Sequence, residues 1–178
     1  MREVFLLLGS NRGNRRELLQ QAKDMITKKT GIILQFSGIY ETEPWGFEDP
    51  IPFLNQTIEI ETLLPPEKLL ETLLDIEKTL GRIRPVKGFG CSLGNGNYDD
   101  SYPAFGNTVP AYYGRTMDID ILFYGTKLFF TDTLMIPHPR LHERFFALRP
   151  LLDIAPKFMH PILRKTITTL LMEMGDKR

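Results

Sequence analysis

Residues 3–29 read EVFLLLGSNRGNRRELLQQAKDMITKK, and this stretch sets the pattern on which the fold is built. Residues 3–8 form a compact apolar run that ends in a cluster of turn-forming residues, which predicts a strand. Apolar residues between Leu18 and Ile26 then recur every three or four positions, which predicts an amphipathic helix ending near Lys29. Asn14 can cap its beginning. The stretch is therefore a strand followed by a helix.

The next segment predicts two strands joined by a loop. Residues 32–40 are strand-like, and residues 53–62 place Ile58 and Ile60 on one face with polar side chains on the other. Residues 41–52, ETEPWGFEDPIP, contain three prolines and one glycine and therefore form the loop between these strands. The two strands are expected to make a wide hairpin.

A second helix and a further strand follow the hairpin. Pro65 and Pro66 can start the helix because their missing N–H groups cost nothing at that position, and Gly81 ends it. Residues 116–124 then alternate in polarity, which predicts a strand. Its expected faces are Met117, Ile119, Ile121 and Phe123 on one side, and Asp118 and Asp120 on the other.

The order of these elements is β-α-β-β-α-β, which predicts an α+β fold of the ferredoxin-like, split β-α-β-β-α-β type. Such a fold has an antiparallel sheet with both helices on one face. A short hairpin through residues 128–130 and short helices around 143–148 and 162–174 would form a C-terminal extension. A single domain over residues 1–178 is expected, with a long inserted loop at about 85–114, and loops of that length are usually functional or mobile.

Composition narrows the choice of partners. The 178 residues carry 22 basic and 22 acidic side chains, so a bulk attraction to nucleic acid or to an anionic membrane is missing. Residues 41–80 nevertheless hold ten acidic and two basic residues, which indicates either a solvated face or one side of a charged cleft. The single cysteine, Cys91, excludes an intramolecular disulfide and suits a reducing, cytoplasmic setting. The apolar run at residues 4–8 is too short for a membrane span.

Asp118 and Asp120 are the first candidates for chemistry. They lie two residues apart on one predicted strand, so their carboxylates share a face with Cα atoms roughly 6.5–7 Å apart. Hard oxygen ligands with room for water and phosphate suit the Mg²⁺ that accompanies a nucleotide. Taken alone, such a pair is more often a solvated strand face, so both interpretations stay open at this point.

Basic residues cluster in sequence around the aspartate pair. Arg82 and Arg84 follow the second helix, Arg115 precedes the pair, and His138 and Arg144 come after it. Guanidinium groups suit phosphate oxygens, although each arginine alone could be an ordinary surface residue. No Walker A loop and no Gly-x-Gly-x-x-Gly motif is present, so any phosphate would be bound by side chains and metal.

Six short motifs, each weak alone, occur in a recognisable order and spacing. They are Leu8-Gly9-Ser10-Asn11; Tyr40-Glu41-Thr42-Glu43-Pro44-Trp45-Gly46 with Phe53-Leu54-Asn55; Ile76-Glu77 with Gly81-Arg82-Ile83-Arg84; Arg115-Thr116-Met117-Asp118-Ile119-Asp120-Ile121-Leu122; Pro137-His138-Pro139-Arg140-Leu141 with Arg144; and Pro150-Leu151. Together they resemble the 6-hydroxymethyl-7,8-dihydropterin pyrophosphokinase family over nearly the whole chain.

The resemblance implies an enzyme of folate biosynthesis that moves the β,γ-pyrophosphate of ATP onto the hydroxymethyl oxygen of a reduced pterin and releases AMP. It implies two Mg²⁺ ions held by Asp118 and Asp120, and ATP as co-substrate. The implied catalytic residues are Arg82, Arg115, Asp118 and Asp120. The implied pterin-binding residues are Gly9, Thr42, Pro44, Trp45, Phe53, Asn55 and Phe146. The implied ATP-binding residues are Glu77, Arg84, Ile121, His138 and Arg144. Only small-molecule partners are expected, with no nucleic acid or membrane, and the chain is expected to be a monomer.

The chain departs from the bacterial pattern of this family at several places. Residues 88–111 are apparently inserted, and Tyr113-Gly114 replaces the usual aromatic and proline, so which aromatic ring covers the pterin is undetermined. Leu74 stands where a glutamine that contacts adenosine is common, and Thr133 and Met135 replace more polar residues near the ATP subsite. These changes predict weaker ATP binding with the chemistry retained.

Two other classes of protein share the expected fold. A small-molecule-binding regulatory module of ferredoxin-like fold would make the aspartate pair incidental, and it would not need arginines on both sides of the long loop. An RNA-binding sheet would need exposed aromatic rings on a basic face. The strand at residues 53–62 offers Glu59 and Glu61 instead.

Overall fold

The structure is a computed structural model that describes residues 2–83 and 114–175. Arg84 and nearly all of the loop expected at residues 85–114 lie outside the described residues. Its strands are β1 (Arg2–Ser10), β2 (Gly31–Phe36), β3 (Tyr40–Thr42), β4 (Phe53–Thr62), β5 (Asp118–Tyr124), β6 (Phe129–Phe130) and β7 (Met135–Ile136). Its helices are α1 (Arg15–Lys29), α2 (Pro66–Thr79), the 3₁₀ turn η1 (Leu141–Glu143), α3 (Phe145–Ile154) and α4 (Ile167–Gly175).

One antiparallel sheet organises the chain. Its strands lie in the order β2-β4-β1-β5. The short strand β3 also pairs with β4, at residues 53–55, whereas β2 pairs with residues 58–62 of that strand. The strands β1 and β5 are neighbours although about a hundred residues separate them. This topology confirms the predicted ferredoxin-like α+β fold, and the small β6–β7 hairpin confirms the hairpin expected near residue 128.

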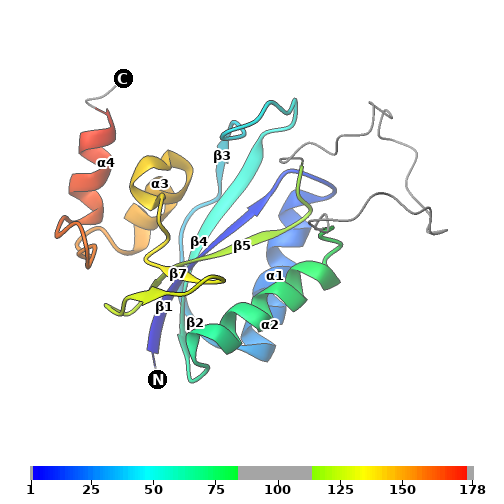
Figure 1. The fold of residues 1–178 in the computed structure, drawn as a ribbon. Coiled ribbons are helices and arrows are strands. Elements are labelled where there is room, and N and C mark those ends of the chain that lie inside the picture. The colour runs from blue at the N-terminus through cyan, green and yellow to red at the C-terminus, as the bar shows by residue number, and fades with distance from the viewer. Residues whose placement is uncertain (1, 84–113, 176–178) are drawn as a thin grey trace.

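Helices cover both faces of the sheet, as Figure 1 shows. The first hydrophobic core lies under α1 and α2, where Leu19, Ile26 and Leu73 pack on Ile58 and Ile60 of β4. The second core lies under α3 and α4. The expected pair of helices on one face is therefore present, and the C-terminal extension supplies a second helical layer on the opposite face.

The predicted alternation of residues 116–124 is wrong at Phe123. The β1–β5 pairing shifts between Phe5 and Leu6, which face Phe123 and Ile121, so Leu122 is an extra residue on β5. Such a bulge turns the following side chains to the other face. Phe123 consequently packs in the second core, 6.3 Å from the ring of Phe5, and Tyr124 lies in the first core.

Two of the C-terminal helix bounds also differ from the prediction. Helix α3 continues through Pro150 to Ile154 instead of ending at residue 148, because Leu148 and Leu151 are both fully buried against the sheet. Helix α4 begins at Ile167, not at residue 162. The ring nitrogen Nδ1 of His160 accepts hydrogen bonds from the N–H groups of Ile162 and Leu163 and holds them in a turn.

Most acidic side chains of residues 41–80 are exposed, but Asp49 and Glu61 are partly buried, and Glu59 and Glu77 are buried. Only 4% of Glu59 is exposed, and its carboxylate accepts a hydrogen bond from Gln35 at 2.5 Å. The pKa of neighbouring Glu3 is raised, mainly by its hydrogen bond with Glu59 and secondly by its burial. The solvated-face interpretation therefore holds for most of this segment and fails for Glu59, Glu77 and Asp49, whose side chain is paired with Arg12. Within residues 2–83 and 114–175, no helix has the length and apolar character that crossing a membrane requires.

Candidate active site

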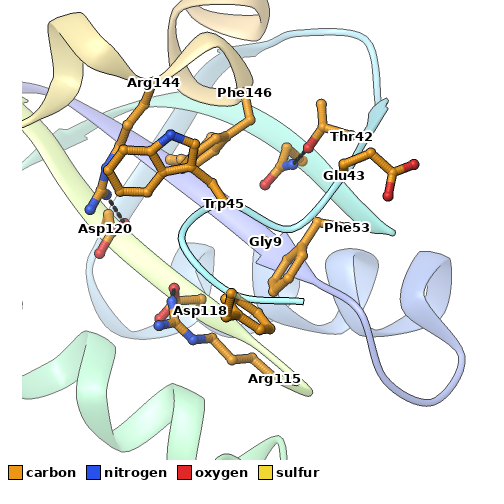
Figure 2. A pocket seen from close by; sticks show the side chains of 13 residues that line it. Gly9, Thr42, Glu43, Trp45, Phe53, Arg115, Asp118, Asp120, Arg144 and Phe146 are labelled. Carbon is orange, nitrogen blue, oxygen red and sulfur yellow. Dashed lines mark hydrogen bonds and ion pairs between the residues drawn. The ribbon is translucent and has the colours of Figure 1, made fainter. Parts of the chain in front are cut away.

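A pocket lies at the end of the sheet where β1 ends and β4 and β5 begin. The loop between β3 and β4 and the start of α3 complete its walls (Figure 2), and it contains about 560 Å³ of space, part of it open to solvent. Its lining residues are Leu7, Gly9, Thr42, Glu43, Trp45, Phe47, Phe53, Asn55, Arg115, Asp118, Asp120, Arg144 and Phe146. Because neighbouring strands are antiparallel, residues far apart in sequence meet at this edge.

Aromatic rings form one half of the pocket. The rings of Trp45 and Phe146 have centroids 6.3 Å apart, and Phe47 meets Phe53 edge to face at 6.2 Å. Rings in such arrangements can stack on a flat heterocycle. Asn55 lies beside them on β4, and its side-chain amide donates a hydrogen bond to Thr42 Oγ1 at 2.8 Å. This half therefore combines apolar faces with a few fixed polar groups.

Gly9 forms the floor between the two halves. It pairs with Asn55 of β4 on one side and with Asp118 of β5 on the other. A Cβ atom at this position would lie 3.1 Å from Asn55 Oδ1 and 3.7 Å from the ring of Phe53. Glycine thus leaves space that any side chain would take from the pocket.

The loop that carries Trp45 and Phe47 is fastened to the turn after β1. Arg12 makes two contacts with Asp49, at 3.0 and 2.5 Å, and the Asn11 amide donates to the Ile51 carbonyl at 3.1 Å. Burial alone would raise the pKa of Asp49, but the hydrogen bond and charge of Arg12 lower it overall. The aromatic half is therefore supported by an ion pair outside the pocket.

The other half of the pocket is charged. Asp118 is paired with Arg115 and, at 3.2 Å, with Arg82 Nη2. Arg144 Nη1 lies 3.6 Å from Asp120 Oδ2. Burial and the negative charge of Asp118 raise the pKa of Asp120 to about 7, against the opposite effect of the arginines. Three arginines thus surround two carboxylates.

Glu77 and Ile121 support this half from behind. Glu77 on α2 is 1% exposed, and its Oε1 accepts the Ile119 N–H at 2.8 Å, which fixes β5 between the two aspartates. Ile121 is buried in the first core. Neither side chain lines the pocket, so a nucleotide contact at Ile121 would fall to its backbone.

His138 contacts the charged half through Arg144. The two side chains approach to 3.2 Å, and burial together with the charge of Arg144 lowers the pKa of His138 to about 4. The imidazole is therefore neutral at pH 7. It can orient Arg144 but adds no positive charge of its own.

The structure brings together most of the residues that the sequence nominated. Six of the seven expected pterin residues line the pocket, and only Pro44 does not. Leu7, Glu43 and Phe47 line it as well and were not predicted. Phe47 and Glu43 lie in a loop whose irregular sequence has no periodicity. The only feature of the sequence that indicates a role for this loop in the pocket is its combination of prolines with two large aromatic side chains.

The two aspartates fit a divalent cation that shares its coordination with a ligand. Within the described ranges, no group of three or more His, Cys, Asp or Glu side chains is arranged to hold a metal ion. Mg²⁺ typically uses one or two protein carboxylates and completes its octahedron with water and phosphate oxygens. Asp118 and Asp120 provide that kind of donor set, and the mutual repulsion of their charges favours a cation between them.

Comparisons with known proteins agree on one family. A model of the family described as 7,8-dihydro-6-hydroxymethylpterin-pyrophosphokinase (HPPK) matches residues 5–93 and 104–156. The 2-amino-4-hydroxy-6-hydroxymethyldihydropteridine pyrophosphokinase of Porphyromonas gingivalis is 36% identical over 89% of this chain and 93% of its own length. The fungal folic acid synthesis protein fol1 of Pneumocystis carinii is 35% identical over 97% of this chain, which spans only 20% of that longer protein.

Solved structures match at the level of the fold. The HPPK-DHPS protein of Plasmodium falciparum in complex with pteroate aligns with a TM-score of 0.70 at 17% sequence identity. The alignment covers 99% of this chain and 43% of the longer chain. The described fold is therefore the one that this part of the longer protein adopts.

Proposed function

Because this chain belongs to the 7,8-dihydro-6-hydroxymethylpterin-pyrophosphokinase family, we propose that it transfers the β,γ-pyrophosphate of ATP to 6-hydroxymethyl-7,8-dihydropterin and releases AMP. The observation that carries this proposal is a single pocket with an aromatic half and a half that holds two carboxylates among three arginines. A flat heterocycle and a metal-bound polyphosphate need these two environments side by side.

The aromatic half binds the pterin. The rings of Phe53 and Phe146 face its flat surface, while the side-chain amide of Asn55 reads hydrogen-bonding groups at its edge. Thr42 fixes the orientation of that amide. Gly9 leaves room for the ring system, and Trp45 and Pro44 belong to the loop that shapes this end.

The charged half binds the triphosphate and its metal. Asp118 and Asp120 would hold Mg²⁺, which supplies charge neutralisation for the phosphate oxygens that move during transfer. The resemblance to the family implies two such ions, with phosphate oxygens and water completing their coordination shells. Arg115, Arg82 and Arg144 neutralise the remaining charge. His138 orients Arg144, and Glu77, Ile121 and Arg84 belong to the nucleotide side.

The reaction is an in-line substitution at the β-phosphorus. The hydroxymethyl oxygen of the pterin forms a bond to that phosphorus, the bond from the phosphorus to the oxygen bridging the α- and β-phosphates breaks, and AMP leaves with the bridging oxygen. The hydroxyl proton passes to solvent. Positioning of the two substrates and stabilisation of charge by Arg82 and Arg115 lower the barrier, as is usual in phosphoryl transfer.

Release of AMP tests the proposal directly. Purified protein with ATP, 6-hydroxymethyl-7,8-dihydropterin and Mg²⁺ is expected to form AMP and a pterin diphosphate in equal amounts, measured by chromatography. Omitting the pterin or adding excess EDTA should abolish AMP release, and Mg²⁺ in excess of EDTA should restore it. AMP release that needs no pterin, or none under any condition, would overturn the assignment.

Two further expectations accompany this function. A monomeric enzyme remains a prediction, which size-exclusion chromatography with light scattering tests. A reducing, cytoplasmic setting remains a prediction from the single cysteine. The alternative of a regulatory module is not supported, because the family match extends over the aspartate pair and its arginines.

A further inference from the structure

Trp45 is the single tryptophan of the sequence, and it lies between charged and aromatic side chains from another part of the chain. The guanidinium carbon of Arg140 lies 4.3 Å from the centroid of its ring, and that of Arg144 lies 5.1 Å away. Phe146 flanks it at 6.3 Å. Figure 2 shows Trp45 beside Arg144 and Phe146 at the mouth of the pocket.

The two arginines differ in what else they contact. Arg144 lines the pocket, and it also meets Asp120 and His138. Arg140 does not line the pocket, and about half of its side chain is exposed. Its Nε donates to Glu143 at 3.2 Å, which aims the guanidinium at the face of Trp45. Arg140 therefore influences the pocket through its contact with the Trp45 ring.

We propose that Arg140 is a positioning residue that fixes the Trp45 ring as a wall of the pterin subsite. A guanidinium over an indole face is held by electrostatic attraction to the ring and by planar stacking. Trp45 needs such a contact because it lies in an irregular loop and precedes Gly46, which has a φ of +83°. A ring already held in place spares the pterin the entropic cost of ordering it.

This role makes a prediction that separates the two substrates, and it rests on the proposed function only for the identity of the ligand. Loss of the Arg140 contact should weaken pterin binding, because Trp45 belongs to the aromatic half. ATP binding should be unaffected, because the phosphate-facing residues Arg115 and Arg144 remain. A general loss of folding would instead change the KM values for both substrates as well as kcat.

Arg140→Met tests the proposal because methionine keeps an unbranched side chain and removes the charge. The KM for 6-hydroxymethyl-7,8-dihydropterin is expected to rise about three- to fivefold, with the KM for ATP and kcat within about twofold of the original values. Arg140→Lys keeps the charge without the planar group and should recover part of the loss. Lys23→Met is the matched control, since Lys23 lies over the ring of Phe36 at 4.8 Å, away from the pocket, and it should leave both KM values unchanged.

Fluorescence gives a second readout that needs no substrate. Because Trp45 is the sole tryptophan, acrylamide quenching of its emission reports the access of solvent to this ring alone. Quenching should increase in Arg140→Met and stay unchanged in Lys23→Met. An unchanged pterin KM with unchanged quenching would overturn the positioning role, as would a rise in the KM for ATP instead. Absence of AMP formation by the unaltered protein would overturn the proposed function and leave the quenching result as an independent test of the contact.

Discussion

Asp118 and Asp120 experience different surroundings although they lie two residues apart on β5. Asp118 contacts the guanidinium groups of Arg82 and Arg115, whereas Asp120 has its nearest guanidinium at 3.6 Å. Burial and the charge of Asp118 raise the pKa of Asp120 to about 7. Ionisation of Asp120 is therefore disfavoured by its burial and by the neighbouring Asp118, and a bound cation would favour the ionised form.

Replacement of either carboxylate should abolish turnover without unfolding the protein. Asp118→Asn and Asp120→Asn are each expected to lower kcat for AMP formation by at least about 100-fold, because each would remove a proposed ligand of the Mg²⁺ that would stabilise the transferring group. The melting temperature of Asp120→Asn in EDTA should not fall, since the substitution removes repulsion between two carboxylates. Activity assays and circular dichroism measure the two quantities, and turnover retained in both variants would contradict the metal site.

Gly9 allows a test of the aromatic half by a single methyl group. In Gly9→Ala the added Cβ would lie 3.1 Å from Asn55 Oδ1, so Asn55 must move away from Thr42 or the pterin must shift. The KM for the pterin is expected to rise about tenfold or more, which corresponds to roughly 1.4 kcal/mol, with the KM for ATP unchanged. Gly175→Ala is the matched control, because nothing lies within 4 Å of the Cβ that it adds. Equal KM values in the two variants would show that Gly9 does not bound the pterin site.

Individual site residues could be predicted where they occupy regular strands. Asp118 and Asp120 follow from alternation on β5, whereas Asn55, at the start of β4, was nominated only through the family resemblance. Phe47 could not be predicted, because its position depends on the ion pair of Arg12 with Asp49, and a contact across 37 residues leaves no periodic signal.

At the scale of elements, helix α3 connects the pocket with the edge of the sheet. Its first turn supplies Phe146, and its last turn supplies Asp153, which accepts hydrogen bonds from Tyr40 Oη at 2.8 Å and from the Gly38 N–H at 3.1 Å. Arg149 completes the cluster, with its Nη1 2.8 Å from Asp153 and its guanidinium over the Tyr40 ring. Asp153 thus fastens α3 to the segment that enters β3.

The contribution of Asp153 should depend on pH. Burial alone would raise its pKa, but hydrogen bonds from Tyr40, Arg149 and Gly38 lower it overall, so folding favours the ionised form. Its stabilisation is therefore fully present above the unfolded-chain pKa of about 3.9 and is lost as pH falls through the lower pKa of the folded state. Asp153→Ala is expected to reduce the free energy of unfolding by about 1–3 kcal/mol at pH 7, and by less once pH falls through the lowered pKa of the folded state.

Urea unfolding at several pH values measures this difference. Asp75→Ala is the matched control, because Asp75 also joins two elements through an ion pair, with Lys29 at 2.7 Å, but on the exposed surface of α1 and α2. It should have little effect at any pH, since exposed ion pairs contribute little. A loss in Asp153→Ala that does not change with pH would show that the side chain acts through packing alone.

The existence and order of the elements could be predicted more completely than their ends. The apolar periodicity of α1 and α2 and the caps at Asn14 and Pro65 are local signals, and the structure confirms both helices. The bulge on β5 at Leu122 and the continuation of α3 through Pro150 depend on packing against β1 and the sheet. Local propensity argues against both, so neither could be read from the sequence.

At the scale of the whole molecule, the pocket depends on both helical layers. The charged half lies on β5, which α2 supports through Glu77, and the first core lies beneath it. The aromatic half includes Phe146, which packs against the second core under α3 and α4. The strands β1 and β5 contribute side chains to both cores, whereas β4 contributes apolar side chains to the first core. This arrangement predicts that the two layers unfold together.

Matched substitutions in the two cores test this cooperativity. Leu73 on α2 and Leu148 on α3 are both fully buried, so Leu73→Ala and Leu148→Ala should each cost about 2–5 kcal/mol of stability. If the described elements form one cooperative unit, both variants will shift a single transition to lower urea concentration, with the same midpoint by circular dichroism and by Trp45 fluorescence. Circular dichroism reports both layers, whereas Trp45 reports the pocket beside α3. Midpoints that separate in Leu148→Ala would show that the C-terminal layer unfolds by itself, and the expectation of a single domain would then be wrong.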